Sequence, residues 1–386
     1  MNDIRPFQIA VAQADLDDLA RRLDHVRLPD RETAGDGVQG PPMEEMRALL
    51  DHWRTRYDWR RCEAKLNAFP QFITEVDGVD IHFIHVRSPR ADATPILLAH
   101  GWPGSILEFE DCIGPLSDPA AYGAPDAPAF HVIVPSMPGF GFSGKPSEPG
   151  WHIGRIAGAY ATLMARLGYD GWICQGGDLG SAVAEAMGHM RAQGCAGLHL
   201  NMSFFQPTPE EIQNADEQER EYLGRARVFF EERMGYFAVQ GTRPQTIAYA
   251  LADSPAGLAA WMFDKFFEAA DYHGGHITDA LSMDRMLDGI SLYWLTNSGA
   301  SSAKLYWELK RAMPPAPPPP IGLPTAYSGF AGETILASRR WLEKRFTALA
   351  YYNLVDRGGH FAAWEQPALF VNELRAMAPH LLKRRE

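Results

Sequence analysis

Residues 171–180 read GWICQGGDLG, an apolar run that ends in Gly-Gly-Asp-Leu-Gly. A short apolar run bounded by glycine predicts a buried strand over 171–175, and the residues after it predict a helix over 179–193 that ends at Gly194. Between the two lies Asp178, flanked by small residues that permit a tight turn. Such a turn projects its central side chain from the top of the sheet. The small residues are Gly176, Gly177 and Gly180.

The alternation of strand and helix continues on both sides of this turn. Asp77 and Gly78 separate two strand-like runs and predict a two-residue hairpin turn. Ser105 and Glu108 have capping-box spacing, which predicts the start of a helix. Repetition of this kind implies a mostly parallel sheet with helices on both faces. The other predicted strands are residues 72–76, 79–86, 95–100, 130–135, 198–202, 324–328 and 350–355, and the other helices are 153–167 and 368–377.

Helical patterns precede and interrupt this alternation. Leu16, Leu19 and Leu23 recur at helical spacing near the start of the chain. From about residue 205 the pattern is again helical and rich in aromatic residues, until a proline-rich run at 314–320 predicts a stiff spacer. The expected α/β-hydrolase organisation is a helical extension (1–70), a core (71–204 and 320–386) and a helical lid (205–319).

The composition is that of an ordinary globular protein, with 46% apolar residues, 22% charged residues and a net charge of −12. Nucleic acids and anionic membranes reward clustered Lys and Arg, so neither is expected as a partner. The four cysteines form no CxxC pair, which argues against a disulfide framework or a zinc site. Without a signal-peptide pattern or a membrane-spanning run, the expectation is a soluble, cytoplasmic protein.

Asp178 is the candidate nucleophile. It holds the centre of a nucleophile elbow, where many hydrolases have serine, and no G-x-S-x-G motif occurs in the chain. The structural alternative is an aspartate that caps a helix after a glycine turn. Backbone N–H groups of Leu179 and Trp102 are the expected oxyanion hole. Trp102 belongs to the loop after the first core strand, His100-Gly101-Trp102-Pro103-Gly104-Ser105.

Two Gly-Gly-His sequences compete as the source of a catalytic base. His360 follows the last apolar strand, at the edge where open α/β sheets bind ligands, whereas His276 lies within the predicted lid. His360 is therefore the predicted base. Glu333 is the predicted acid that fixes its tautomer, and Asp356 is the alternative. The chain order of Asp178, Glu333 and His360 is the nucleophile–acid–base order of this fold.

Neither a cofactor nor a metal is indicated. Residues 139–144 match G-x-G-x-x-G, but the next predicted helix starts well after the loop, so no helix N-terminus faces it. His273 and His276 are close in sequence, but no carboxylate or cysteine joins them at convincing spacing. The expected chemistry uses side chains alone.

Together these motifs resemble the microsomal-type epoxide hydrolases over nearly the whole chain, including the N-terminal extension. The resemblance is carried by HGWPGS at 100–105, GGDLG at 176–180, DSPAGLAAW at 253–261 and GGHFAAWEQP at 358–367. It implies an enzyme that opens an epoxide to a diol without a cofactor.

The resemblance also implies a role for each site residue. Asp178 would form a covalent ester with the substrate, and His360 with Glu333 would activate the water that cleaves it. The family uses two lid tyrosines to polarise the epoxide oxygen, and Tyr236 and Tyr306 match them. From the helical pattern alone, both would be read as core aromatic residues.

Three departures from the family pattern are visible. Leu179 stands where the family usually has tryptophan after the nucleophile, and Ala331 stands where many members have proline before the acid. The microsomal members begin with a membrane anchor, and no such segment is recognised here, so the chain looks like the soluble bacterial branch. Some relatives act in enediyne antibiotic pathways, and membership of such a pathway stays open.

Three alternative functions remain at this point. A haloalkane dehalogenase shares the aspartate and the lid, but halide release calls for N–H donors and not for phenols. A serine esterase would use Ser105 or Ser181, and a catalytically silent relative would only bind a ligand. The aromatic lid favours a bulky or aromatic epoxide as the small-molecule partner. Assembly as a homodimer is compatible with the sequence but not indicated by it.

Overall fold

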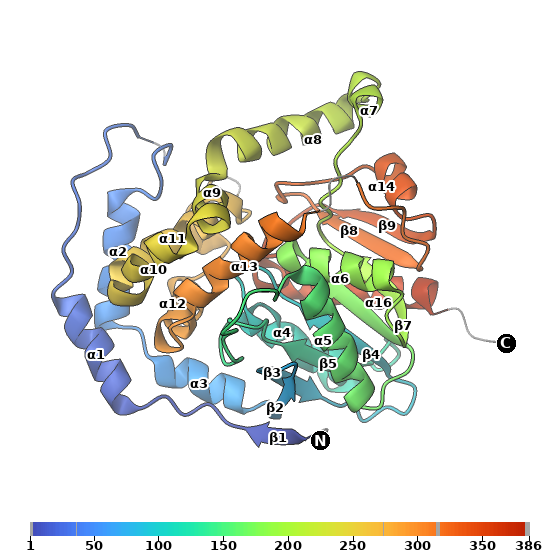
Figure 1. The fold of residues 1–386 in the computed structure, drawn as a ribbon, viewed down its shortest axis with the longest axis horizontal. Coiled ribbons are helices and arrows are strands. Elements are labelled where there is room, and N and C mark those ends of the chain that lie inside the picture. The colour runs from blue at the N-terminus through green and yellow to red at the C-terminus, as the bar shows by residue number, and fades with distance from the viewer. Residues whose placement is uncertain (1–2, 36, 273, 314–316, 383–386) are drawn as a thin grey trace.

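The predicted strands form a single sheet. In the computed structural model, which describes residues 3–35, 37–272, 274–313 and 317–382, nine strands lie in the order β1-β2-β3-β5-β4-β6-β7-β8-β9 (Figure 1). The pairs β1–β2, β2–β3 and β3–β5 are antiparallel. All pairs from β5–β4 to β8–β9 are parallel. The strands are β1 (Ile4–Phe7), β2 (Gln71–Val76), β3 (Val79–Val86), β4 (Thr94–Ala99), β5 (Phe130–Pro135), β6 (Trp172–Gly176), β7 (Cys195–Leu200), β8 (Thr325–Phe330) and β9 (Leu349–Val355).

The local signals in the sequence have the expected structural result at most positions. Asp77 and Gly78 both have positive φ, 51° and 80°, as a primed two-residue hairpin turn requires. Ser105 and Glu108 form a complete capping box at the 3-10 turn Ile106–Phe109. β1 is absent from the prediction because it has four residues, one of them proline, and its stability comes from pairing with β2.

The predicted end of the helix after Asp178 is wrong. That helix, α6 (Asp178–Met190), stops at Arg191, which takes the left-handed conformation at φ 50°. Gly194 also has positive φ, at 78°, but it lies in the turn before β7, and its carbonyl accepts the N–H groups of Gly171 and Trp172. The glycine therefore serves the turn into the next strand and not the helix terminus.

Helices cover the sheet in two packed pairs. α5 (Ile153–Arg166) packs on α6, and α4 (Glu110–Ser117) packs on α16 (Pro367–Leu381). Two shorter helices, α14 (Arg339–Arg345) and α15 (Ala362–Glu365), complete this part. None of the helices in the described part of the chain is long and apolar enough to span a bilayer.

A helical insertion separates β7 from β8 in the chain. Its helices lie together above the sheet, with α7 and α8 across the top of Figure 1. The first residues of the predicted proline spacer, 314–316, and His273 lie outside the described residues. The helices are α7 (Pro209–Gln213), α8 (Glu217–Val228), α9 (Gly235–Thr242), α10 (Pro244–Asp253), α11 (Pro255–Ala269), α12 (Met283–Leu295) and α13 (Ser298–Ala312).

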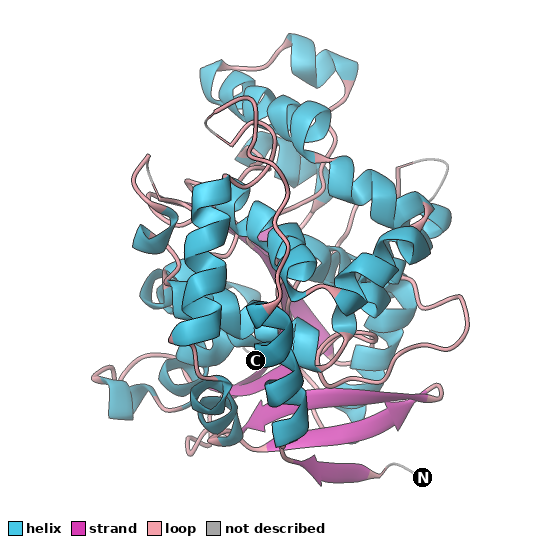
Figure 2. Ribbon diagram, turned by 90° about the vertical axis from the view of Figure 1, so that its left-hand side faces the viewer, coloured by secondary structure: helices cyan, strands magenta, loops and turns pink. Residues whose placement is uncertain are grey.

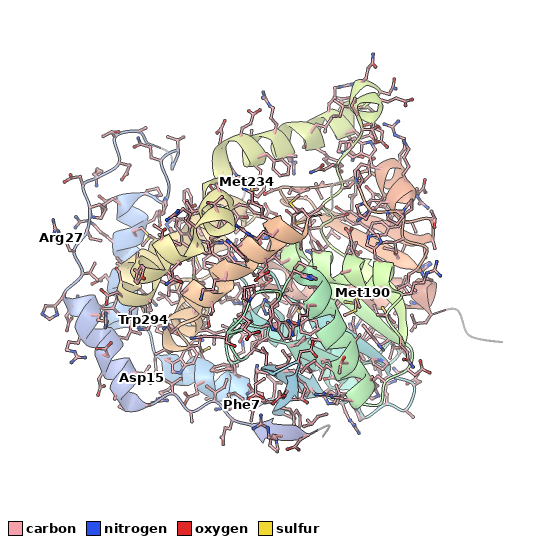
Figure 3. All side chains as sticks on the ribbon, in the orientation of Figure 1. Phe7, Asp15, Arg27, Met190, Met234 and Trp294 are labelled. Atoms are coloured by element: carbon pink, nitrogen blue, oxygen red, sulfur yellow. The ribbon has the colours of Figure 1, made fainter. Side chains whose placement is uncertain are left out.

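The N-terminal helices pack against this insertion. α1 (Gln13–Asp24), α2 (Met43–Thr55) and α3 (Trp59–Asn67) lie on one side of the molecule, seen from another direction in Figure 2. Arg22 of α1 lies over the ring of Trp294 in α12, 5.5 Å from its centroid (Trp294 is labelled in Figure 3). Tyr57 and Arg61 both donate hydrogen bonds of 2.8 Å to buried Asp288. The extension thus contacts the insertion as well as the sheet, to which it adds β1.

Candidate active site

The loops that follow the parallel strands carry the predicted site residues to one edge of the sheet. Trp102 follows β4, Asp178 begins α6 directly after β6, Glu333 follows β8 and His360 follows β9. Because these strands are parallel, their carboxyl ends lie at the same edge. The helical insertion supplies Tyr236 on α9 and Tyr306 on α13.

The turn at Asp178 is strained and sterically tight. Asp178 has a φ of 47°, in the left-handed region, which costs a non-glycine residue about 1–2 kcal/mol. Gly176 ends β6 and Gly177 is the N-cap of α6. A Cβ on Gly180 would lie 2.0 Å from the carbonyl oxygen of Ala99, and one on Gly101 would lie 2.4 Å from the Asp178 side chain. Only glycine fits at either close approach.

The two carboxylate oxygens of Asp178 have different partners. Oδ1 accepts the backbone N–H of Trp102 at 2.9 Å, and Oδ2 lies 3.5 Å from Nε2 of His360. The N–H of Leu179 lies in the first turn of α6, where backbone donors have no partner within the helix. The peptide bond between Trp102 and Pro103 is cis.

His360 and Glu333 form a buried pair. Nδ1 of His360 lies 3.0 Å from Oε2 of Glu333, whose side chain is 1% exposed. Glu333 also accepts the backbone N–H groups of Thr334 and Ile335, at 2.7 and 3.2 Å. Burial alone would lower the pKa of His360, but Glu333 and Asp178 outweigh it and hold this pKa well above its usual value. The resting imidazole is therefore protonated between two carboxylates.

A second buried glutamate holds the histidine loop. Glu365 accepts the N–H groups of Gly359, Phe361 and Asp271, each within 2.9 Å, and burial raises its pKa to about 7. The N–H of His360 itself donates to the carbonyl of Ala269 at the end of α11, 2.9 Å away. No sequence motif marks Glu365, because its partners are backbone N–H groups, two of them in its own loop and the third, from Asp271, brought to it only when the insertion folds against the core.

Tyr236 and Tyr306 face each other across the insertion, with ring centroids 5.7 Å apart. Trp102 stacks on Tyr236 at 5.0 Å, and Nζ of Lys265 lies 4.7 Å from the Tyr236 centroid. Burial raises the pKa of both phenols above the usual value, and the nearby Asp178 adds to the effect. The Tyr306 hydroxyl makes no hydrogen bond of normal geometry among the described residues, and the phenol of Tyr236 is the group it interacts with.

A cavity of about 410 Å³ joins these groups on the insertion side of Asp178. The nucleophile candidate, His360 and both tyrosines line it, together with Met234, which Figure 3 labels between α8 and α9. Lys265 and Glu268 are polar exceptions in an otherwise mainly apolar wall. The aromatic and aliphatic lining includes Phe204, Phe205, Phe229, Phe230, Phe237 and Leu309.

A second, much smaller cavity of about 20 Å³ lies on the core side of Asp178. It shares Trp102, Asp178, His360 and Phe361 with the larger one, but its other walls come from the strand ends, the loop and 3-10 turn after β4, α15 and the first part of α16. Its polar lining includes Glu108, Gln175 and Asn201.

The supporting histidine of the HGWPGS loop is neutral and structural. The N–H of Met137 donates to Nε2 of His100 at 3.1 Å, so Nδ1 carries the proton and donates to the carbonyl of Gly101 at 2.9 Å. Burial lowers the pKa of His100 to about 4. His100 thus ties the β4 loop to the loop after β5.

The structure gives the alternative candidates other surroundings or other roles. Asp356 is exposed, and the His276 side chain is 48% exposed beside Glu45. Ser105 caps the turn at Ile106–Phe109, and Ser181 donates its hydroxyl to the backbone carbonyl of Asp178. In residues 139–144 the N–H of Gly139 donates to the carbonyl of Gly144, which closes the loop on itself well before α5 begins.

Comparisons with known sequences agree with this geometry. Residues 4–109 match the family model described as the epoxide hydrolase N terminus, and residues 94–233 match that of the α/β hydrolase fold. A protein of Stigmatella aurantiaca, provisionally named an epoxide hydrolase, is 51% identical over 372 residues, which cover 96% of this chain and 84% of the relative. Epoxide hydrolase 1 of Sus scrofa is 33% identical, over 96% of this chain and 88% of the relative.

Solved structures extend the likeness to the whole architecture. The epoxide hydrolase of Aspergillus niger is similar with a TM-score of 0.87 at 32% identity, over 98% of this chain and 97% of that one. The juvenile hormone epoxide hydrolase of Bombyx mori has a TM-score of 0.87 at 26% identity, over 99% and 95%. Extension, core and insertion are all covered, and the chain belongs to the microsomal-type epoxide hydrolases, enzymes of the α/β-hydrolase fold.

Proposed function

We propose that the enzyme converts an epoxide and water to a vicinal diol through a covalent ester on Asp178. The observation that carries the proposal is the position of this one carboxylate. Oδ1 accepts the Trp102 amide, Oδ2 lies beside His360, and the same side chain lines the cavity that holds Tyr236 and Tyr306. A nucleophile, an oxyanion donor, a base and two acids are thus within reach of one substrate.

In the first step Oδ2 of Asp178 attacks an epoxide carbon, and the carbon–oxygen bond of the ring breaks. The departing oxygen takes a proton from Tyr236 or Tyr306, whose hydroxyl groups face the cavity. The product is an alkyl ester with Oδ2 as its bridging oxygen. Oδ1 becomes the ester carbonyl oxygen and already lies against the Trp102 amide.

In the second step water attacks Cγ of the ester. Esterification removes the negative charge of Asp178, one of the two charges that raise the pKa of His360. The imidazolium then gives its proton, by way of solvent, to the phenolate left by the first step, and the neutral imidazole accepts a proton from the attacking water, while Glu333 keeps Nδ1 protonated. Negative charge on Oδ1 meets the amides of Trp102 and Leu179, and cleavage between Cγ and Oδ2 releases the diol. The released alkoxide takes its proton from His360, and the carboxylic acid formed on Asp178 returns a proton to His360, which restores the resting state.

A bulky, mainly apolar or aromatic epoxide is the proposed substrate class. A cavity of about 410 Å³ with six phenylalanines in its wall suits such a molecule. Of the aromatic residues of the insertion that suggested this class, Phe229, Phe230 and Phe237 line the cavity. Phe263 and Tyr293 are 1% exposed and belong to the core, so they carry no information about the substrate.

The test is to trap the ester. His360→Gln removes the base and leaves the nucleophile, so mixing this variant with styrene oxide should raise the intact mass by one substrate mass, on the peptide that contains Asp178. In the unaltered enzyme, one turnover in ¹⁸O-water should place the label in Asp178 and not in the diol. An adduct on Ser105 or Ser181, or label in the first diol formed, would overturn the proposal.

The same assays separate the remaining alternatives. A dehalogenase would release chloride from a haloalkane without forming diol from an epoxide. A silent binding protein would give neither product, and Asp178→Asn would leave its ligand affinity unchanged. We expect diol formation that Asp178→Asn abolishes.

A further inference from the structure

The small cavity on the core side of Asp178 has room for one molecule of water. Its volume of about 20 Å³ exceeds the roughly 10–15 Å³ that one water needs. Asp178 and His360 both line it, so a molecule inside would contact the nucleophile and the base of the proposed reaction. The substrate cavity lies on the other side of the same carboxylate.

One polar atom in the wall of this cavity has no hydrogen-bond partner, and a water in the cavity could donate a hydrogen bond to it. Gln175 is 1% exposed, and its Oε1 has no hydrogen-bond partner among the described residues. The other end of that side chain is fixed, because Nε2 donates to Oδ1 of Asn201 at 2.9 Å. Glu108 uses Oε1 to accept the N–H of Ser105 at 3.1 Å, and its carboxyl also lines the cavity. A buried, unpaired acceptor costs free energy unless something donates to it.

We propose that this cavity holds the hydrolytic water, with Glu108 and Gln175 as its positioning residues. The inference rests on the proposed ester mechanism. Water has two hydrogens, and His360 removes one of them as the oxygen attacks Cγ. The other hydrogen needs an acceptor, which the unpaired Oε1 of Gln175 provides, while the Glu108 carboxyl, one oxygen of which accepts the Ser105 N–H, turns its second oxygen to the water. Glu108 then has two functions, as part of a capping box and as part of the water site.

The position of the cavity explains how water reaches the ester while the substrate cavity is full. After the first step the alkyl group occupies the insertion side of Asp178. A water held on the core side does not have to pass it. Burial raises the pKa of Glu108 to about 8, so near neutral pH this carboxyl is mostly uncharged and does not repel the carboxylate of Asp178.

Rapid-quench kinetics on Glu108→Gln tests the assignment. The amide keeps the volume and keeps an oxygen for the Ser105 N–H. We expect ester formation at the unaltered rate and ester hydrolysis slower by about tenfold, the value of one lost hydrogen bond, so that the ester accumulates. Gln175→Met, which removes the unpaired acceptor, should also slow ester hydrolysis relative to ester formation.

Ser105→Ala is the matched control, since it removes the other half of the same capping box and lines neither cavity. If Glu108 only caps the turn, both variants should change the two rate constants alike. Unchanged hydrolysis in Glu108→Gln, or equal slowing of both steps, would overturn the inference.

A crystal structure of the free enzyme gives a direct check, because one water should contact His360 Nε2 and Glu108. A dry cavity would also overturn the inference. Failure of every variant to form an ester on Asp178 would instead refute the proposed mechanism itself.

Discussion

The two sides of Asp178 differ in size, polarity and origin. On one side lies a cavity of about 410 Å³ with a mainly apolar wall, and on the other a cavity of about 20 Å³ with Glu108, Gln175 and Asn201 in its wall. The large cavity is built mostly by the helical insertion, and the small one by the strand ends and the helices packed on them. The contrast suggests that the two half-reactions are served from opposite faces of one carboxylate. Changes in the residues of the insertion could then alter which substrate is accepted without altering the small cavity on the core side.

The two sides also use titratable groups differently. On the insertion side, burial keeps Tyr236 and Tyr306 protonated, which suits acids. Glu333 and Asp178 hold the pKa of His360 well above its usual value, so in the proposed mechanism the imidazole stays charged until the ester forms. The base would then become available only after the acids have acted, and variants of the acids and of the base should affect different steps.

The largest effect is expected from Glu333→Gln, at the partner of the base. The amide cannot stabilise the imidazolium, and in a triad such a change costs about 10⁴-fold in rate. We expect ester hydrolysis to fall by about this factor while ester formation persists, so that rapid-quench samples contain nearly stoichiometric adduct. Asp356→Asn, at the exposed alternative acid, is the matched control and should behave like the unaltered enzyme. Equal losses in both variants would remove Glu333 from the mechanism.

Tyr236→Phe combined with Tyr306→Phe tests the opposite side. Without either phenol the departing oxygen receives no proton, and general acids contribute about 10²–10⁴-fold. We expect ester formation to slow by about this factor, measured as the rate of mass increase in the His360→Gln background. Tyr249→Phe, at a tyrosine that is 72% exposed, controls for loss of a hydroxyl on the insertion. If the double variant forms ester at the unaltered rate but hydrolyses it slowly, the division between the sides fails.

The sequence predicts the core side of this arrangement better than the insertion side. Asp178 and His360 each follow a strand signal, and parallel strands carry such residues to one edge whatever the rest of the chain does. Ser105 and Glu108 are readable as a capping box, but that the Glu108 carboxyl also lines a cavity depends on Gln175 in another strand. Local spacing contains no information about such long-range contacts.

The insertion side depends still more on long-range packing. Tyr236 and Tyr306 are recognisable only through the family resemblance, since aromatic residues in helices usually belong to the core. Lys265 lies in α11 among apolar residues, and nothing near it in the chain indicates that its ammonium group lies over the ring of Tyr236. Glu365 holds the His360 loop through backbone N–H groups that no side-chain motif reveals.

Lys265→Met should produce a moderate effect confined to the insertion side. The ammonium lies over the face of Tyr236, where a cation favours the negative charge that develops when the phenol gives up its proton. Its removal should raise the pKa of Tyr236 and slow ester formation by about 3–30-fold, without changing hydrolysis. Arg311→Met removes a similar contact, 3.6 Å from the ring of Trp307, outside both cavities. Slower hydrolysis in Lys265→Met would show that α11 acts through the His360 loop and not through Tyr236.

The smallest effect is a pH dependence of stability that reports on the core side. Burial raises the pKa of Glu108 from its ordinary 4.5 to about 8. Between these values the unfolded chain ionises this carboxyl and the folded chain does not, so the stability it contributes is complete below pH 4.5 and is lost as the pH rises towards 8. Glu108→Gln removes that loss, so its Tm relative to the unaltered enzyme should rise by a few degrees from pH 5 to pH 8.

Comparing the two proteins at each pH isolates this carboxyl from other buried groups. His360 and Glu365 titrate in both proteins, so the difference between the two Tm values contains only the ionisation of Glu108 and its charge–charge coupling to these two groups. A difference that stays constant across the window would mean that Glu108 ionises as freely in the folded enzyme as in the unfolded chain. The core cavity would then hold a charged carboxylate close to Asp178, and a water between them would have to screen two like charges instead of connecting an acceptor to a base. Whether the Tm difference rises or stays constant therefore decides whether the water site on the core side of the ester contains a neutral or a charged carboxyl group.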